Sequence, residues 1–398
     1  MRLKDLKIKY FKGKPPRIKE GASLLPYLTP DYIRKGSTPE YYPMQSGVVL
    51  VEDDELILLW DGSNAGEFFK GKKGILSSTM VKFDKVDEAN DEYFYYSLKL
   101  QEQTLKSKTA GSGIPHVDKD SLYNLEIYLP EKSHQSTIAT ILTTIDQSLE
   151  KTEQLIAKYE RIKTGLMQDL LTCGIDEQGN IRSEETHEFK DSVLGRIPKE
   201  WEIYSIDKVC LNVIDCPHST PEYLKGGILV ARTMHIKNGQ YDIQNTSYVS
   251  EEEYINRIQR LEPHSGDIIF TREAPVGEAF IVPEGMKICL GQRVMQLRPN
   301  LVFCLPEYLL ELIYSEKTRL RFDGIVGGTT NPHLNVSDVK KFEFAVPKPD
   351  EQIRICNSLK GLRDLLNKEQ DNLKKATKLK TALMQDLLTG KVRVDALN

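Results

Sequence analysis

Two nine-residue stretches, one near the middle of this chain and one near its end, are almost identical. Residues 164–172 read TGLMQDLLT and residues 381–389 read TALMQDLLT. When the sequence is shifted by 217 positions, residues 111–172 align with residues 328–389 without a gap, and 20 of the 62 positions are identical. This agreement indicates an internal duplication, and its long period excludes a solenoid of short repeats.

The rear part of each copy has the spacing of a coiled-coil helix. Apolar residues recur at alternating intervals of four and three, which is the heptad pattern. The seam of the first copy is Ile138, Leu142, Ile145, Leu149, Thr152, Ile156, Tyr159, Lys163, Leu166 and Leu170. The seam of the second is Ile355, Leu359, Leu362, Leu366, Glu369, Leu373, Ala376, Lys380, Leu383 and Leu387. The polar residues inside these seams are expected to fix the register at a cost in stability.

The ends of both helices carry recognisable signals. Pro130 and Pro347 precede the helices, where proline is tolerated. Gly174 and Gly390 follow the repeated LLT and are expected to end them.

The two helices are predicted to pair with each other in antiparallel orientation. An apolar stripe of four heptads does not stay in water, and these are the long seams of the sequence. The chain also has to travel out along one helix, form a globular part and return along the other. The alternative is that each helix is buried in its own domain.

The front part of each half is predicted to be an α+β domain. Residues 47–60 and 266–299 contain short apolar runs with glycine and proline punctuation, which favour strands, and there is no regular alternation with helices. The predicted fold is two globular α/β domains joined by two long helices that form an antiparallel coiled coil, with pseudo-twofold symmetry. The predicted boundaries are a first domain at 1–130, a helix at 131–172, a linker at 173–200, a second domain at 201–347 and a helix at 348–392.

Composition and motifs argue against several classes of protein. Hydrophobic residues make up 39% of the chain and charged residues 28%, and no apolar run approaches the ~20 residues of a membrane helix. Six scattered cysteines without a CxxC pair favour reduced thiols and a cytoplasmic location. No P-loop, GxGxxG, HExxH or nucleophile-elbow motif occurs, so we expect neither a cofactor nor a metal site.

Catalysis is not expected either. The two halves share His116 and His333, but the sequence places no equally shared carboxylate or nucleophile beside them. The net charge of −4 does not indicate a generally basic surface. Residues 1–20, however, contain eight Lys or Arg and two acidic residues, which is either a solvated basic arm or a strip that faces phosphates.

The sequence resembles the specificity (S) subunits of Type I restriction-modification systems over nearly its whole length. The resemblance is carried by residues 111–142 and 328–359, by both LMQDLLT ends and by LGRIPKEWE at 194–202. The first half has no counterpart of LGRIPKEWE and begins at a position equivalent to about Ser205, so the first domain is expected to begin slightly short, with its role unchanged.

The resemblance implies a DNA-binding subunit without catalysis of its own. In that family each variable domain is a target recognition domain that reads one half of a split double-stranded DNA site. The two helices act as a spacer and as the docking surface for two modification (methyltransferase) subunits, and restriction subunits join the assembly. A coiled-coil scaffold and a stand-alone enzyme with an unrecognised site are the alternatives.

Candidate DNA contacts are loop residues whose side chains can reach base edges, such as Arg or Lys for guanine and Asn or Gln for adenine. In the first domain they are Arg34, Lys35, Asp61, Asn64, Lys72 and Lys73. In the second they are Arg232, Thr233, His235, Lys237, Thr271, Arg272, Gln292 and Arg293. The shared Pro-His pairs either set a turn or touch DNA. Helices of about 40 residues are roughly 60 Å long, so two readers would stand about one to two DNA turns apart.

Overall fold

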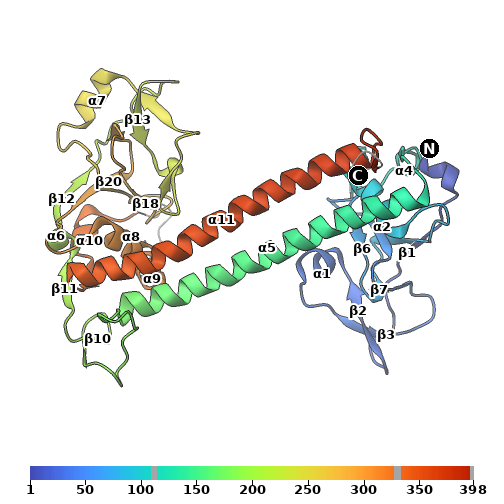
Figure 1. Ribbon diagram of the computed structural model, residues 1–398, viewed down its shortest axis with the longest axis horizontal. Helices are drawn as coiled ribbons and strands as arrows, with labels where there is room; N and C mark the ends of the chain where they lie inside the picture. The colour runs from blue at the N-terminus through green and yellow to red at the C-terminus, as the bar shows by residue number, and fades with distance from the viewer. Residues whose placement is uncertain (109–113, 327–332, 395–398) are drawn as a thin grey trace. The chain divides into compact units, whose positions relative to one another are not determined.

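The computed structural model describes residues 1–108, 114–326 and 333–394, and these form two compact units (Figure 1). Unit 1 comprises Met1–Gln154 and Gln370–Asn398, and unit 2 comprises Leu155–Glu369. Each unit therefore contains one front domain and a part of both long helices. The first residues of the repeat, 111–113 and 328–332, lie outside the described residues.

Two four-stranded sheets form the domain of unit 1. The first has the order β1 (Tyr10–Lys12), β8 (Met80–Phe83), β5 (Leu56–Leu59), β6 (Phe68–Lys70), and its neighbours are antiparallel. The second has the order β3 (Tyr41–Pro43), β2 (Leu24–Leu28), β7 (Gly74–Leu76), β4 (Leu50–Val51), and β2 and β7 are parallel. The helices are η1 (Leu3–Leu6), α1 (Pro30–Lys35), α2 (Asp91–Leu100), α3 (Glu102–Lys106) and α4 (Lys119–Tyr123).

The domain of unit 2 is built in the same order. Its main sheet is β12 (Cys210–Asp215), β20 (Val294–Pro299), β17 (Ile268–Thr271), β18 (Ala279–Ile281), again antiparallel. Its second sheet is β16 (Ser247–Val249), β13 (Ile228–Ala231), β19 (Ile288–Leu290), and β13 and β19 are parallel. Two-stranded sheets pair β9 (Phe189–Lys190) with β10 (Ile197–Pro198), β11 (Glu202–Ser205) with β21 (Glu343–Val346), and β14 (Ile236–Lys237) with β15 (Gln240–Tyr241). The helices are α6 (Ile206–Val209), η2 (Thr233–His235), α7 (Glu251–Arg257), α8 (Pro306–Tyr314), α9 (Glu316–Val326) and α10 (Val336–Lys341).

The common topology confirms the predicted pair of α+β domains. In both units a central strand with a continuous apolar run, LILL in β5 and IIFT in β17, lies between two antiparallel neighbours. Such runs are typical of strands that are covered on both faces, and β17 is buried along its whole length. The main sheets therefore agree in topology although their strands differ in sequence.

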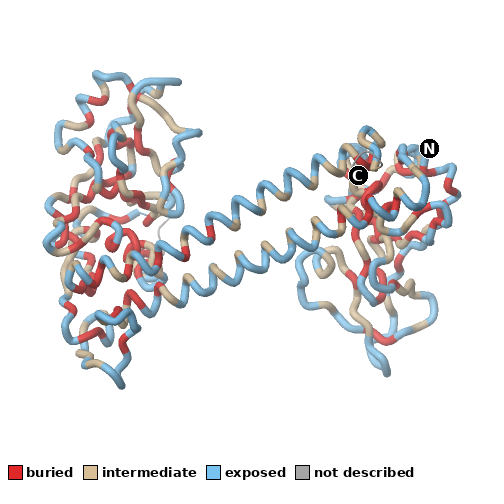
Figure 2. Tube along the Cα trace, viewed as in Figure 1, coloured by how far each residue is buried: buried red, intermediate tan, exposed pale blue. Residues whose placement is uncertain are grey.

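The predicted seams are the faces that the long helices bury. Helix α5 extends over Lys132–Thr172, and α11 over Pro349–Leu387. Along residues 147–166 of α5, the six seam positions are half-buried and all the remaining positions are exposed (Figure 2). Residues 367–382 of α11 show the same pattern. The second helix ends before residue 392, because Gly390 adopts a left-handed conformation with φ of 72°.

The two helices lie side by side and antiparallel within each unit. In unit 1 the start of α5, at Ile138 and Leu142, shares a core with Leu387 near the end of α11. In unit 2 the end of α5, at Leu170, shares a core with Ile355 near the start of α11. The alternative of two separately buried helices is therefore wrong. Among the described residues, no helix combines the length and apolar character needed to cross a membrane.

A buried glutamine attaches each helix to its own domain. Gln135 donates from Nε2 to the carbonyls of Pro130 and Glu88, and its Oε1 accepts from the Asn90 N–H. Gln352 makes the same three bonds in unit 2, as donor to the carbonyls of Pro347 and Phe303 and as acceptor from the Leu305 N–H. Both side chains are at most 1% exposed. The repeated proline and glutamine, five residues apart, are thus a joint between the helix start and the loop before α2 or α8.

The polar segment at 173–200 is docked onto unit 2. Arg182 and Glu351 form an ion pair in which both side chains are 6% exposed. The Glu351 carboxylate also accepts from the indole N–H of Trp201 and from the backbone N–H of Ile175. A buried carboxylate with these partners anchors the segment to the start of α11.

Unit 1 lacks most of the first strand, as the sequence comparison suggested. Unit 2 pairs the four residues of β11 with β21, whereas unit 1 pairs only Met1–Leu3 with residues 125–127, through the Arg2–Glu126 bridge and the backbone bonds beside it. Glu126 corresponds to Glu343, the residue that pairs with Ser205. The role of the domain in the fold is unchanged, because the larger sheets are complete in both units.

The polar seam residues meet different partners in the two units. In unit 1, Lys380 of α11 pairs with Asp146 of α5 at 2.5 Å, and Asp146 also accepts from the hydroxyl of Tyr96 in α2. In unit 2, the residue at the position of Asp146 is Arg363, which pairs with buried Glu311 of α8. Burial and the positive charge of Arg363 lower the pKa of Lys163, the counterpart of Lys380.

Substitution of the two repeated lysines should therefore have opposite effects on stability. We expect Lys380→Met to lower the free energy of unfolding by roughly 1 kcal/mol, because Asp146 loses its ion-pair partner. We expect Lys163→Met to raise it by roughly 0.5 kcal/mol, because a half-buried cation next to another cation is removed. Urea unfolding of the two variants measures both changes, and an equal loss of stability in both would contradict the assignment.

Candidate nucleic-acid interface

Several loops of unit 2 meet at one edge of its domain. The register places the end of β12 at Asp215, the start of β20 at Val294 and the end of β17 at Thr271 at the same edge of the main sheet. The second sheet joins there, because the Gly291 N–H donates to the Ala231 carbonyl at the ends of β19 and β13. We call the residues that follow or precede these strand ends the loop edge of unit 2.

Four charged residues form a network at this edge. Arg272 donates from Nε to Asp215 at 3.0 Å and pairs with Glu273 at 3.3 Å, and its side chain is 12% exposed. Arg293 pairs with Glu273 at 3.2 Å from a side chain that is 59% exposed. Its backbone has φ of 67°, a conformation that non-glycine residues rarely adopt and that is often found at functional sites. Arg272 thus ties two loops together, while Arg293 extends toward solvent.

Other predicted contacts of the second domain lie at or near the same edge. Arg232 follows β13, donates to the Ser247 hydroxyl and lies over the Tyr223 ring. Gln292 donates to the His218 carbonyl at 3.4 Å. Thr233 is half-buried in η2, and Lys237 is exposed in β14.

Two predicted contacts have buried side chains. Thr271 is fully buried, and its hydroxyl donates to the Pro275 carbonyl. His235 is 3% exposed, and burial together with the charge of Arg232 lowers its pKa. Both side chains serve the interior of the domain in this structure, and a contact with DNA stays a prediction for them.

The corresponding edge of unit 1 holds only part of the predicted set. Asp61 follows β5, pairs with Lys12 at 2.8 Å and begins the turn that contains exposed Asn64. Lys72 and Lys73 follow β6 at the other end of β5, since Leu56 pairs with Lys70 and Leu58 with Phe68. The structure therefore separates the lysine pair from Asp61 and Asn64.

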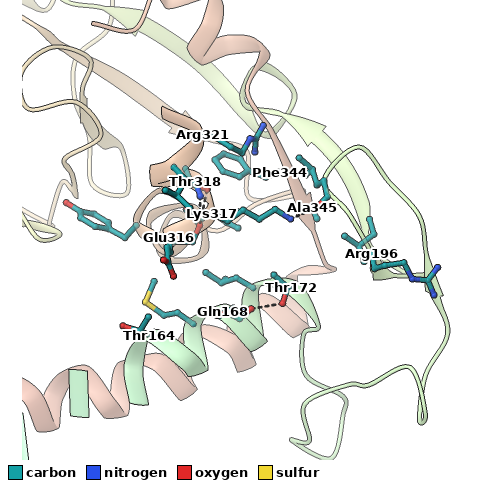
Figure 3. Close-up of a pocket in the computed structure, with 18 residues that line it drawn as sticks. Thr164, Gln168, Thr172, Arg196, Glu316, Lys317, Thr318, Arg321, Phe344 and Ala345 are labelled. Carbon is teal, nitrogen blue, oxygen red and sulfur yellow. Dashed lines mark hydrogen bonds between the residues drawn. The ribbon is translucent and has the colours of Figure 1, made fainter. Parts of the chain in front are cut away.

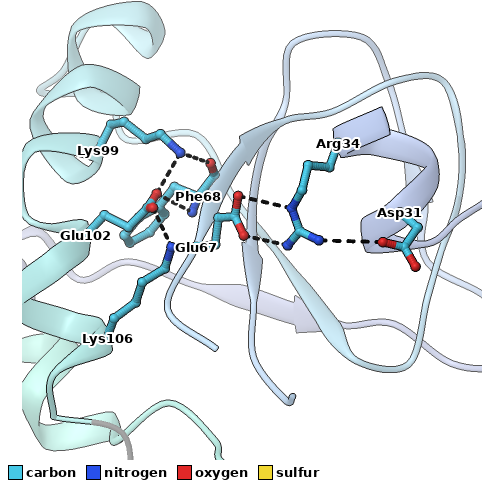
Figure 4. Close-up of polar contacts among 7 residues, drawn as sticks. All are labelled: Asp31, Arg34, Glu67, Phe68, Lys99, Glu102 and Lys106. Atoms are coloured by element: carbon cyan, nitrogen blue, oxygen red, sulfur yellow. Dashed lines mark hydrogen bonds and ion pairs between the residues drawn. The ribbon is translucent and has the colours of Figure 1, made fainter. Parts of the chain in front are cut away.

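The remaining pair belongs to α1. Figure 4 shows that Arg34 is held between Glu67 and Asp31, and that Glu67 is followed by Phe68, whose N–H donates to Glu102. The hydrogen bond with the Glu67 carboxylate is the main reason why the pKa of Arg34 is raised. Lys35 is exposed at the end of the helix. Arg34 consequently has an intramolecular role, which the sequence did not indicate because Glu67 lies 33 residues away.

The structure places an acidic residue opposite each repeated histidine, although the residue is aspartate in unit 1 and glutamate in unit 2. Asp61 forms a backbone bridge with His116, and Glu273 forms the same bridge with His333. Residues directly opposite in such a bridge project from one face. The sequence alignment missed the pair because Asp61 precedes its histidine by 55 residues and Glu273 by 60.

A cavity of unit 2 lies away from the loop edge. It has a volume of about 610 Å³ and lies between the end of α5, the start of α9 and β21 (Figure 3). Its walls are largely apolar, with Lys317 and Arg321 at the rim, and it contains none of the loop-edge residues. Within the described ranges no three His, Cys, Asp or Glu side chains are grouped as metal ligands would be.

Comparisons with known proteins agree with these features. The family described as "Type I restriction modification DNA specificity domain" matches residues 2–161 and 198–375. A Type I restriction enzyme MjaVIII specificity subunit of Methanocaldococcus jannaschii is 32% identical over 98% of this chain and 92% of its own length. The MjaIX specificity subunit of the same organism is 23% identical over 78% of this chain and 71% of its own length.

Solved structures share the fold at low sequence identity. The S subunit of a Type I restriction-modification system from M. genitalium is 16% identical, with a TM-score of 0.61 over 96% of this chain and 93% of that chain. A chain from a structural study of assembly and conformational transition in the type I R-M system has a TM-score of 0.54 and 16% identity, over 96% of this chain and 97% of that chain. From the two family matches and the full-length relative, the chain belongs to the family of Type I restriction-modification specificity subunits.

Proposed function

We propose that this chain is the DNA-reading subunit of a Type I restriction-modification complex and has no catalytic activity of its own. One observation carries the proposal: the two units repeat the same main sheet and present different loops at the same edge. A common scaffold with divergent loops suits two readers of different sequences. The target is then bipartite, with one half read by the domain at 1–130 and the other by the domain at 201–347.

The side chains at the loop edges support contact with double-stranded DNA. Arg232 and Gln292 have the donor groups that recognise guanine and adenine in the major groove. Exposed cations such as Arg293 and Lys12 add affinity that is independent of sequence. The lysine-rich residues 1–20 would contribute to the same attraction.

The long helices support a spacer function. Helix α5 has 41 residues and α11 has 39, so each is roughly 60 Å long at about 1.5 Å per residue. A spacer of fixed length leaves a run of unread base pairs between the half-sites. The length of the gap is then set by the helices rather than by contacts with bases.

The repeated helices also support docking of two modification subunits. Ile162 of α5 and Leu379 of α11 are 217 residues apart and occupy equivalent positions, and they are 44% and 55% exposed. Apolar side chains kept at equivalent exposed positions suit two copies of one partner. Restriction subunits would join this assembly on DNA in the cytoplasm.

Replacement of the domain at 201–347 by that of another family member tests the bipartite reading. The complex reconstituted with its modification subunits should methylate a target that is altered in one half and unchanged in the other. The purified chain alone should transfer no methyl group. Altered preference in both halves would contradict the division of labour, and methyl transfer by the isolated chain would establish an enzyme instead.

Gln292→Ala tests base reading by the loop edge. We expect affinity of the complex for its cognate duplex to fall by 5- to 150-fold, or roughly 1–3 kcal/mol, because a bidentate contact with one base is lost. Binding to an unrelated duplex should not change. Gln178→Ala, in the exposed turn of the docked segment, is the matched control and should leave both affinities as they were. An equal loss of affinity for both duplexes would show that Gln292 contacts the sugar–phosphate backbone of the DNA instead of a base.

Ile162→Lys and Leu379→Lys test the docking surface. Each substitution places a charge at one of two equivalent positions, so each should reduce the number of bound modification subunits from two to one. Mass spectrometry of the intact complex measures the stoichiometry. Ser148→Lys, at an exposed polar position of α5, is the control. Two bound subunits in both variants would place the docking surface elsewhere.

A further inference from the structure

Each unit presents the same constellation of charge at its loop edge. It consists of an exposed cation, a half-buried carboxylate and an exposed histidine. In unit 1 these are Lys12, Asp61 and His116, and in unit 2 they are Arg293, Glu273 and His333.

The geometry in unit 1 begins at the end of the central strand. Asp61 follows β5 and pairs with Lys12, the last residue of β1, at 2.8 Å. The carboxylate is 29% exposed and the lysine 51%. On the other side, the backbone of Asp61 is bridged to His116, and the Val117 N–H donates to the Trp60 carbonyl next to it. Asp61 is therefore adjacent to Lys12 through its side chain and to His116 through its backbone.

Unit 2 repeats this geometry with a different cation. Glu273 is also 29% exposed, and it pairs with Arg293, which is 59% exposed. Its backbone is bridged to His333, and the Leu334 N–H donates to the Arg272 carbonyl next to it. The cation comes from the loop before β20, whereas in unit 1 it comes from the end of β1.

The two domains keep the same three kinds of charged or polar group although the residues around them differ. The neighbouring residues diverge, and Thr79 precedes β8 where Arg293 precedes β20. The histidine is identical, the carboxylate stands at the equivalent position as Asp61 or Glu273, and only the cation comes from a different element. A group retained in two domains with different loops suits a feature that both half-sites share. Bases differ between half-sites, whereas the sugar–phosphate backbone does not.

We propose that each constellation is a clamp for one phosphodiester of the DNA backbone, which rests on the proposed DNA-reading function and adds residues to it. The cation and the imidazole N–H are the donors, and a phosphodiester offers the acceptor oxygens and the negative charge. The half-buried carboxylate pairs with the cation, and the backbone bridge places the histidine next to the carboxylate residue. In this proposal Arg293 contacts the sugar–phosphate backbone of the DNA, and neighbouring residues such as Gln292 contact the bases.

The test measures binding of the complex, reconstituted with its modification subunits, to its cognate duplex and to an unrelated duplex of equal length. The variants are Lys12→Ala, His116→Ala, Arg293→Asn and His333→Ala, where asparagine suits the left-handed backbone at 293. Each should weaken binding to both duplexes by the same factor, roughly three- to tenfold. Lys12→Ala and Arg293→Asn should also reduce the slope of log affinity against log salt by about 0.9.

The matched control is Lys85→Ala. Lys85 pairs with Asp91 at 3.0 Å, as Lys12 pairs with Asp61, but it lies beyond the opposite end of β8. Its removal should change neither affinity nor slope. Lys12→Arg should restore the wild-type values, since arginine keeps the charge.

Duplexes with single neutral methylphosphonates identify the phosphate. Wild type should lose affinity at one position in each half-site, and Arg293→Asn should be insensitive to the substitution in one of them. Three results would overturn the clamp. The variants could lose affinity for the cognate duplex alone, or all four could bind both duplexes as the wild type does. The variants could also fail to assemble with the modification subunit when no DNA is present. If the wild-type complex bound no DNA, the proposed function would fall together with it.

Discussion

A buried amide at the start of each long helix controls how the helix joins its domain. Gln135 and Gln352 use both ends of the side chain, each donating to two carbonyls and accepting from one backbone N–H. A buried amide that loses part of such a set costs about 1–3 kcal/mol, so the joint tolerates little variation in direction. Such a joint holds the domain, and with it the loops at its edge, in one direction on its helix.

The two helices are near copies, yet the charges along them differ in a way that distinguishes the units. Lys163 and Lys380 are identical in the repeat, whereas the residue that faces each of them is Arg363 in one unit and Asp146 in the other. Arg363 pairs with Glu311 of α8, and the corresponding partner of Asp146 in unit 1 is Tyr96 of α2. A duplicated seam supplies the apolar contacts twice. The polar contacts differ between the two ends of the helix pair, and such differences fix the register in coiled coils.

The topology of the main sheet is common to both domains, while the loops at its edge differ. Antiparallel pairing of β12, β20 and β17, or of β1, β8 and β5, brings strand ends that are distant in sequence to one edge. Side chains on those ends can change without loss of the core, which lies in the strands themselves. The arrangement therefore separates stability from recognition. It also explains why the rear parts of the two halves align without gaps while the front parts do not.

Periodicity and repetition, read from the sequence alone, determined the two helices, their seam positions and the presence of two α+β domains, because these depend on residues close together in the chain. The same reading could not find the joint at Gln135, the anchor between Arg182 and Glu351, or the carboxylate beside each histidine. Nor could it show that Glu67 occupies Arg34, or that Lys72 and Lys73 lie at the far end of β5 from Asp61. Those relations join residues that are distant in sequence, and only the register of the strands and the packing of the core bring them together or keep them apart.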